Sequence, residues 1–79
     1  MNEQEILKLL NQYGSRRLMV KIAYNNFKKG INRESCDGVK SLLQTAKNLL
    51  PKTILTESDR TFLSELCNEG IAYCESFKK

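Results

Sequence analysis

Apolar residues recur every three or four positions along this 79-residue chain, in four segments separated by Gly14, Gly30 and Pro51. This spacing places apolar side chains on one face of an α-helix, and no segment alternates as a half-buried strand does. Glycine commonly follows the last turn of a helix, and the residue before proline avoids the α region. The sequence therefore predicts an all-α fold, a compact bundle of four short helices that forms a single helical domain over residues 1–79.

The helices are predicted over residues 2–13, 16–29, from Asn32 or Ser35 to the residue before Pro51, and from Thr56 toward the C-terminus. Asn2, Ser15 and Thr56 are the residue types that cap helix N-termini. Gly70 interrupts the fourth helix, which indicates either a close helix crossing or a bend. The alternative to an intramolecular bundle is a three-helix core whose fourth helix is exchanged into a dimer partner.

The predicted core follows the best helical stripes. In the second helix the inner stripe is Val20, Ala23 and Phe27, and in the third it repeats at heptad-like spacing. The opposite face of the second helix carries Arg17, Lys21, Tyr24 and Lys28 at i, i+4, i+7 and i+11. The residues expected to be mostly buried are Leu10, Val20, Phe27, Val39, Leu43, Ala46, Leu50, Leu63 and Leu66.

The charge of the chain is unevenly distributed. No acid occurs between Glu5 and Glu34, whereas that stretch holds seven bases, and the formal net charge is +4. Residues 1–55 contain ten bases and four acids, and residues 56–79 contain three bases and five acids. This asymmetry indicates either internal complementarity or a positive face that attracts nucleic acid, an acidic protein or an anionic membrane.

The composition argues against catalysis and metal binding. The chain contains no histidine, so neither a Ser-His nor a Cys-His nucleophile is available, and no zinc site is completed by its three cysteines. We expect no enzyme activity, no cofactor and no metal.

Cys36, Cys67 and Cys74 are expected to be reduced and buried, since only an oxidising compartment would support a disulfide from Cys36. No run reaches the roughly 20 apolar residues of a membrane span, and a cytoplasmic location is expected.

Two features suggest DNA binding. The first two predicted helices, joined at Gly14, favour a helix-turn-helix, although the position that normally fills its core is Arg16. Residues 55–63, Leu-Thr-Glu-Ser-Asp-Arg-Thr-Phe-Leu, followed by Glu69-Gly70 and Tyr73, resemble the opening of the helix-turn-helix in sigma-factor region 4. The resemblance covers about a quarter of the chain, would require a recognition helix after Lys79 and carries over no DNA-reading residue.

We therefore expect a small non-enzymatic interaction protein that docks on a larger acidic protein through the basic face of its second helix. Such chains are typical of phage and mobile-element regulators that inhibit a host protein. The alternative is a nucleic-acid-binding helical domain using the same face. We expect a monomer or a homodimer, and we expect Arg17→Glu combined with Lys21→Glu to abolish binding without harming the fold. The predicted partner-binding residues are Arg16, Arg17, Lys21, Tyr24 and Lys28.

Overall fold

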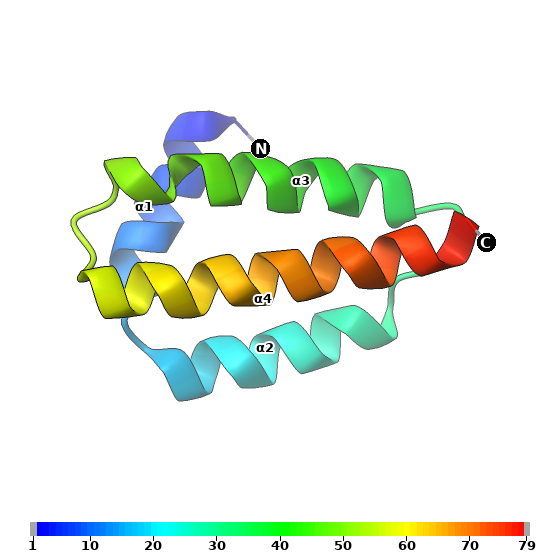
Figure 1. Cartoon of the computed structure of the whole chain (residues 1–79), viewed down its shortest axis with the longest axis horizontal. Helices are drawn as coiled ribbons and strands as arrows, with labels where there is room; N and C mark the ends of the chain where they lie inside the picture. The colour runs from blue at the N-terminus through cyan, green and yellow to red at the C-terminus, as the bar shows by residue number, and fades with distance from the viewer. Residues whose placement is uncertain (1, 79) are drawn as a thin grey trace.

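The computed structural model describes residues 2–78 and consists of four α-helices (Figure 1). They are α1 (Glu3–Tyr13), α2 (Arg17–Lys29), α3 (Cys36–Leu49) and α4 (Glu57–Glu75), with short 3₁₀ turns at Leu50–Lys52 (η1) and Ser76–Lys78 (η2). No strand occurs within these residues. The predicted all-α bundle of four short helices is confirmed.

Local hydrogen bonds explain where the helices begin. The side chain of Asn2 accepts from the backbone N–H of Glu5, and Thr56 does the same for Asp59, so both predicted caps are confirmed. The prediction of Ser15 as a cap is wrong, because α2 begins after Arg16 and has no side-chain cap. Before α3, the Asn32 side chain accepts from the backbone N–H of Ser35, while the Ser35 hydroxyl accepts from the backbone N–H of Asn32.

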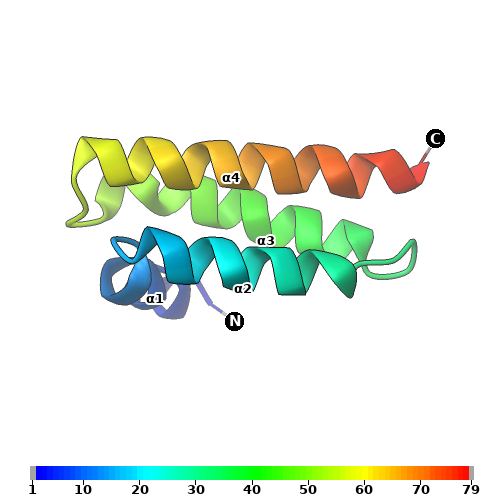
Figure 2. The ribbon, with the colours of Figure 1, turned by 90° about the horizontal axis from the view of Figure 1, so that it is seen from below.

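The helices form a flattened body in which α4 lies between α3 and α2, and α1 crosses behind the end at which α4 begins (Figures 1 and 2). The body measures 36 × 24 × 17 Å. The half of the body that lacks α1 has no helix of residues 2–78 behind it (Figure 2).

The core is split into two buried clusters at opposite ends. One contains Leu50, Leu55 and Leu63, and the other contains Ile31, Cys36 and Cys74. Of the nine predicted core residues, Leu50, Leu63 and Leu66 are buried and five are half-buried. The prediction for Phe27 is wrong, because this residue is 47% exposed. The five half-buried residues are Leu10, Val20, Val39, Leu43 and Ala46.

Gly70 marks a close approach within the bundle. A Cβ atom there would lie 2.6 Å from Cδ1 of Leu43 and 3.3 Å from the ring of Tyr24. Leu43 of α3 and Tyr24 of α2 therefore pack against the backbone of α4 at Gly70. The helix is continuous from Glu57 to Glu75, so of the two explanations offered for Gly70 the close helix crossing is the one observed. In this single chain α4 packs mainly against α3.

Candidate binding surface

The orientation of α2 about its own axis differs from the prediction. Tyr24, predicted at the edge of an outer basic face, is the buried residue of this helix and is 8% exposed. Ala23 and Phe27, predicted to face inward, are exposed. The aromatic ring of Tyr24 buries more apolar surface beside Gly70 than Ala23 offers, while lysine stems lie along the same contact and keep their ammonium groups near water.

The basic face of α2 is therefore turned toward the acids of α4. The Nε atom of Arg17 lies 2.8 Å from Oδ1 of Asp59. The ammonium groups of Lys21 and Lys28 lie 3.7 and 3.6 Å from the carboxylate of Glu69. Three of the seven bases in the acid-free stretch thus pair with acids of α4, so part of the uneven charge is neutralised within the chain.

Cation–aromatic contacts reinforce this pairing. The guanidinium of Arg17 lies 5.5 Å from the ring centroid of Phe62, and the ammonium of Lys28 lies 4.7 Å from that of Tyr73. Such contacts contribute about 0.5–1 kcal/mol each at exposed positions. The contacts of Arg17 offset the unfavourable electrostatic free energy of a positive charge at the N-terminal end of α2, where the helix dipole is positive. They therefore explain why an arginine occupies this position.

Four of the five predicted partner-binding residues, Arg17, Lys21, Tyr24 and Lys28, thus contact α4 or lie against it. Arg16 is the exception, since it is exposed and its guanidinium lies 5.8 Å from the centroid of the Tyr13 ring. These contacts predict that reversing Arg17 and Lys21 also destabilises the fold. Two new carboxylates would face Asp59 and Glu69, and like charges at these distances destabilise the α2–α4 contact.

The surface that α2 turns to solvent carries five apolar residues beside the polar Asn25 and Asn26. We call these five residues the apolar arc; its largest exposures are 78% for Leu18 and 54% for Ile22. Leu18 and Ile22 are spaced i, i+4 outside the predicted inner stripe, and this pair is the sequence signal for a second apolar face. Patches of this kind mark interaction sites more often than isolated exposed hydrophobes do. The arc consists of Leu18, Met19, Ile22, Ala23 and Phe27.

An apolar groove adjoins the arc. It is a hollow of about 370 Å³ between α1, α2 and α3, and Val20 contributes the α2 side. Leu9, Tyr13 and Leu42 line it although each is more than a third exposed. The accessible surface of the chain is 5368 Å². A compact monomer of this mass exposes about 4,900 Å², so the chain exposes more surface than its size requires.

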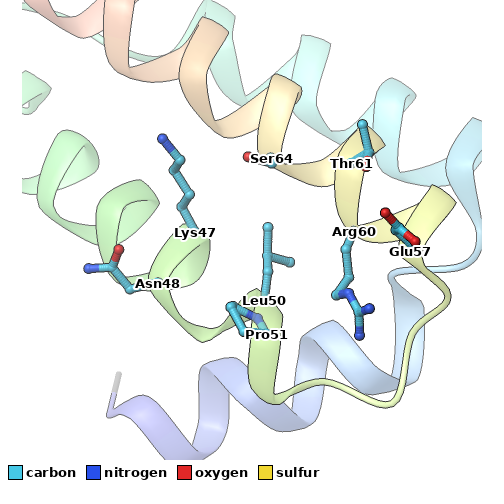
Figure 3. Close-up of a pocket in the computed structure, with 8 residues that line it drawn as sticks. All are labelled: Lys47, Asn48, Leu50, Pro51, Glu57, Arg60, Thr61 and Ser64. Atoms are coloured by element: carbon cyan, nitrogen blue, oxygen red, sulfur yellow. The ribbon is translucent and has the colours of Figure 1, made fainter.

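A second hollow, of about 510 Å³, lies between α3, η1 and the start of α4 (Figure 3). Lys47 and Arg60 lie on either side of Leu50 there, and Glu57 is next to Arg60 (Figure 3). Its hydroxyls, on Thr61 and Ser64, have no histidine or carboxylate base paired with them among the hydrogen bonds of residues 2–78. The arrangement offers polar contacts without the geometry of a nucleophile and its base.

Three thiols and the hydroxyl of Tyr24 lie in the interior of the bundle. Cys36, Cys67 and Cys74 are free and buried, as predicted. Burial raises the pKa of the Cys67 and Cys74 thiols, which keeps them protonated and poorly nucleophilic. Burial, followed by the nearby charge of Glu69, also raises the pKa of Tyr24, whose hydroxyl has no hydrogen-bond partner. Residues 2–78 contain no cluster of three side chains suited to a metal ion.

Comparison of the chain with family models, with curated proteins and with solved structures finds no match. Within the described residues, no helix has the length and apolarity needed to cross a membrane. The exposed surfaces of the bundle are therefore the features from which a function can be proposed.

Proposed function

We propose that this chain is a small non-enzymatic interaction module that binds another protein through the apolar arc of α2. The observation that carries the proposal is the exposure of four large apolar side chains on one helix, Leu18, Met19, Ile22 and Phe27. Hydrating this surface in the free protein is unfavourable by roughly 25 cal/mol per Å² of apolar area. Association with an apolar surface would recover that free energy.

The ion pairs of α2 favour a protein over nucleic acid as the partner. Phosphate contacts need cations whose charge is available. Arg17, Lys21 and Lys28 already contact carboxylates of α4. A helix that presents Leu18 and Ile22 to solvent offers little to a phosphate backbone. The apolar arc thus replaces the basic face as the proposed docking surface, while the protein-partner hypothesis is retained.

The test is affinity capture from the source cell, with nuclease treatment, using two matched substitutions. Ile22→Asp places a charge in the apolar arc, and Ile54→Asp places the same charge at an 84%-exposed loop position outside it. Both positions are exposed, so each variant should unfold within about 0.5 kcal/mol of the parent. We expect a protein that is retained by the parent and by Ile54→Asp and is lost with Ile22→Asp.

The proposal is contradicted if Ile22→Asp retains the same proteins as the parent. Loss of all retained material after nuclease treatment would favour the nucleic-acid alternative instead. Urea unfolding of both variants provides the control that the loss is not caused by unfolding.

A further inference from the structure

One cation of the chain lies at the rim of the apolar groove between α1, α2 and α3. Two residues that line this groove, Tyr13 and Val20, flank Arg16 in the fold. The backbone N–H of Arg16 donates to the carbonyl oxygen of Tyr13 (2.9 Å), and the backbone N–H of Val20 donates to the carbonyl oxygen of Arg16 (2.9 Å). The guanidinium lies 5.8 Å from the centroid of the Tyr13 ring. Local contacts therefore hold Arg16 beside the groove.

The positive charge of Arg16 has no acidic partner within residues 2–78. It is exposed. The nearest acid of α1 to the groove stripe, Glu5, precedes Tyr13 by eight positions, which corresponds to about 12 Å along a helix. The charge of Arg16 is therefore available to an anion that approaches the groove. The ion pairs of this part of the chain involve other cations, namely Arg17, Lys21, Lys28, Lys40 and Lys78.

The groove has room for apolar groups from outside the chain. Its volume is about 370 Å³, whereas a cavity of about 150 Å³ holds one benzene molecule. Two side chains of that size therefore fit. Three wall residues, Leu9, Tyr13 and Leu42, are each more than a third exposed, so the groove is open to solvent.

The apolar surface continues from the groove along one side of α2. At 100° per residue, Val20, Ala23 and Phe27 fall within about 60° of one another. Ala23 and Phe27 are exposed. The midpoint of Leu18 and Ile22 lies about 150° around the helix from this stripe. The groove and its stripe are thus a surface separate from Leu18 and Ile22.

We propose that this groove is a second docking site, which takes an acidic and apolar segment of another protein. Two large apolar side chains of that segment, about one helical turn apart, fill the groove. A carboxylate next to them forms a charge-assisted pair with the guanidinium of Arg16. The site goes beyond the proposed function, because it includes neither Leu18 nor Ile22.

The surroundings of Arg16 favour a peptide carboxylate over other anions. A nucleic-acid backbone is bound by several cations along its length, whereas apolar side chains line this groove. Pockets for small ligands bury most of the ligand surface, whereas the exposed walls at Leu9, Tyr13 and Leu42 leave one side open. An open apolar groove suits side chains that a second protein surface presents.

The test measures the binding of synthetic peptides to the full chain by fluorescence anisotropy. The first probe is a labelled, alanine-based helical peptide of about 14 residues, with leucine at i, phenylalanine at i+4 and one glutamate at i+7 on the same face. The second probe has lysine in place of the glutamate. We expect the glutamate peptide to bind at least about fivefold more tightly at low salt, because the lysine would face Arg16. Equal affinities, or no saturable binding of either peptide, would overturn the proposal.

A charge exchange identifies the cation. Arg16→Glu should reverse the preference, so that the lysine peptide binds more tightly. The matched control is Lys29→Glu, which changes an exposed cation about 20 Å further along α2 and should keep the preference of the parent within about twofold. An unreversed preference in Arg16→Glu, or the same reversal in Lys29→Glu, would contradict the pairing with Arg16.

Filling the groove tests the apolar part of the site. Ala46→Leu adds apolar atoms at a residue that lines the groove, and it should weaken binding of the glutamate peptide about tenfold or more because the space for an anchor is occupied. Ala72→Leu makes the same change at an exposed position of α4 outside the groove and should not alter the affinity. Urea unfolding shows whether each variant is folded. Unchanged binding by folded Ala46→Leu would overturn the proposal, and if this variant is unfolded the Arg16→Glu result decides.

Other occupants of the groove would give different results. A dimer in sedimentation that Ala46→Leu abolishes would identify a second copy of this chain. Tighter binding of duplex DNA or of a long-chain fatty acid than of the glutamate peptide would identify another class of ligand. Each of these results would overturn the acidic-segment proposal.

The second site and the proposed function fail separately. Ile22→Asp should leave peptide binding unchanged, because Ile22 lies outside the groove stripe. Capture from cells that depends on Ile22, together with no peptide binding, would uphold the proposed function and overturn the second site alone. Peptide binding that depends on Arg16, together with capture that does not depend on Ile22, would do the opposite.

Discussion

At the scale of single residues, two glycines differ in their surroundings. A Cβ atom on Gly14 would lie 2.5 Å from the carbonyl oxygen of Leu10 and 2.6 Å from Cδ1 of Leu55, whereas one on Gly38 meets nothing within 4 Å. Gly14→Ala should therefore destabilise the protein by about 1–3 kcal/mol through overpacking. Gly38→Ala should stabilise it by about 0.5–1 kcal/mol through helix propensity and chain entropy. Urea unfolding of both variants measures the difference, and equal effects would contradict the packing at Gly14.

The hydroxyl of Tyr24 supplies a second residue-scale prediction. It is buried without a hydrogen-bond partner, so Tyr24→Phe should raise the free energy of unfolding by about 1 kcal/mol at neutral pH. Burial raises the pKa of this tyrosine above its ordinary value of 10.0 in the folded state. Below pH 10 this tyrosine is neutral in both the folded and the unfolded chain, so its ionisation does not change the free energy of unfolding. Above pH 10 the unfolded chain ionises first, so the free energy of unfolding falls as the pH rises.

Tyr24→Phe should accordingly show a shallower loss of stability above pH 10 than the parent. The measurement is urea unfolding at several pH values between 7 and 11. Cys67 and Cys74, whose pKa values are raised by burial, and Lys78, whose pKa is raised by its hydrogen bond with Asp37, contribute to the alkaline loss in both proteins. A parent and variant with identical pH profiles would show that Tyr24 is hydrated in solution.

At the scale of the helices, α2 is held differently from α4. Five residues of α4 are buried, whereas Tyr24 alone is buried in α2, whose other contacts with α4 are ion pairs and cation–aromatic contacts. Salt screens partly exposed charges. We predict faster amide hydrogen exchange in α2 than in the centre of α4, and a larger acceleration in α2 when 0.5 M NaCl is added.

Hydrogen exchange followed by mass spectrometry measures this prediction, with the peptide covering α3 as the internal reference. Because local opening reflects the free energy of each unit, uniform exchange across α2, α3 and α4 would contradict a weakly held α2. The same result would also argue that the ion pairs of α2 contribute more than exposed pairs usually do.

The sequence predicts the existence of the helices and most of their ends, since periodicity, Asn2, Thr56 and the glycines act locally. It does not predict how α2 is rotated about its axis. Apolar residues occupy more than half of the circumference of α2, so Tyr24 and the pair Val20 and Phe27 offer competing inner faces. The choice depends on Gly70, Asp59 and Glu69, which lie forty to fifty positions from the α2 residues that they contact and meet α2 only in the folded chain.

The candidate surface follows from that rotation. A sequence-based core built on Phe27 leaves the basic residues outside, and the basic face then becomes the predicted docking surface. With Tyr24 inside, Arg17, Lys21 and Lys28 reach their carboxylate partners and the apolar arc is exposed. The predicted exposure of Arg16 and Arg17 agrees with the structure, whereas Lys21 and Lys28 are half-buried and Tyr24 is buried.

At the scale of the whole molecule, the body is thin and its core is split. The helix α1 covers only one half of the body (Figure 2), the two buried clusters lie at opposite ends, and apolar residues such as Val39 and Leu43 stay half-buried. A domain of this size buries only about 60–65% of its unfolded surface. Binding of a partner that covers this region should therefore raise the melting temperature in a concentration-dependent way.

Site-specific photo-crosslinking in the source cell tests the central claim, that the apolar arc of α2 binds a protein, most directly. A benzophenone side chain is placed at position 22, in the arc, or at position 61, on the exposed edge of the polar hollow in Figure 3. The account predicts a covalent adduct with a second protein from position 22 and none from position 61. Adducts from position 61 alone, or none from position 22, would contradict it.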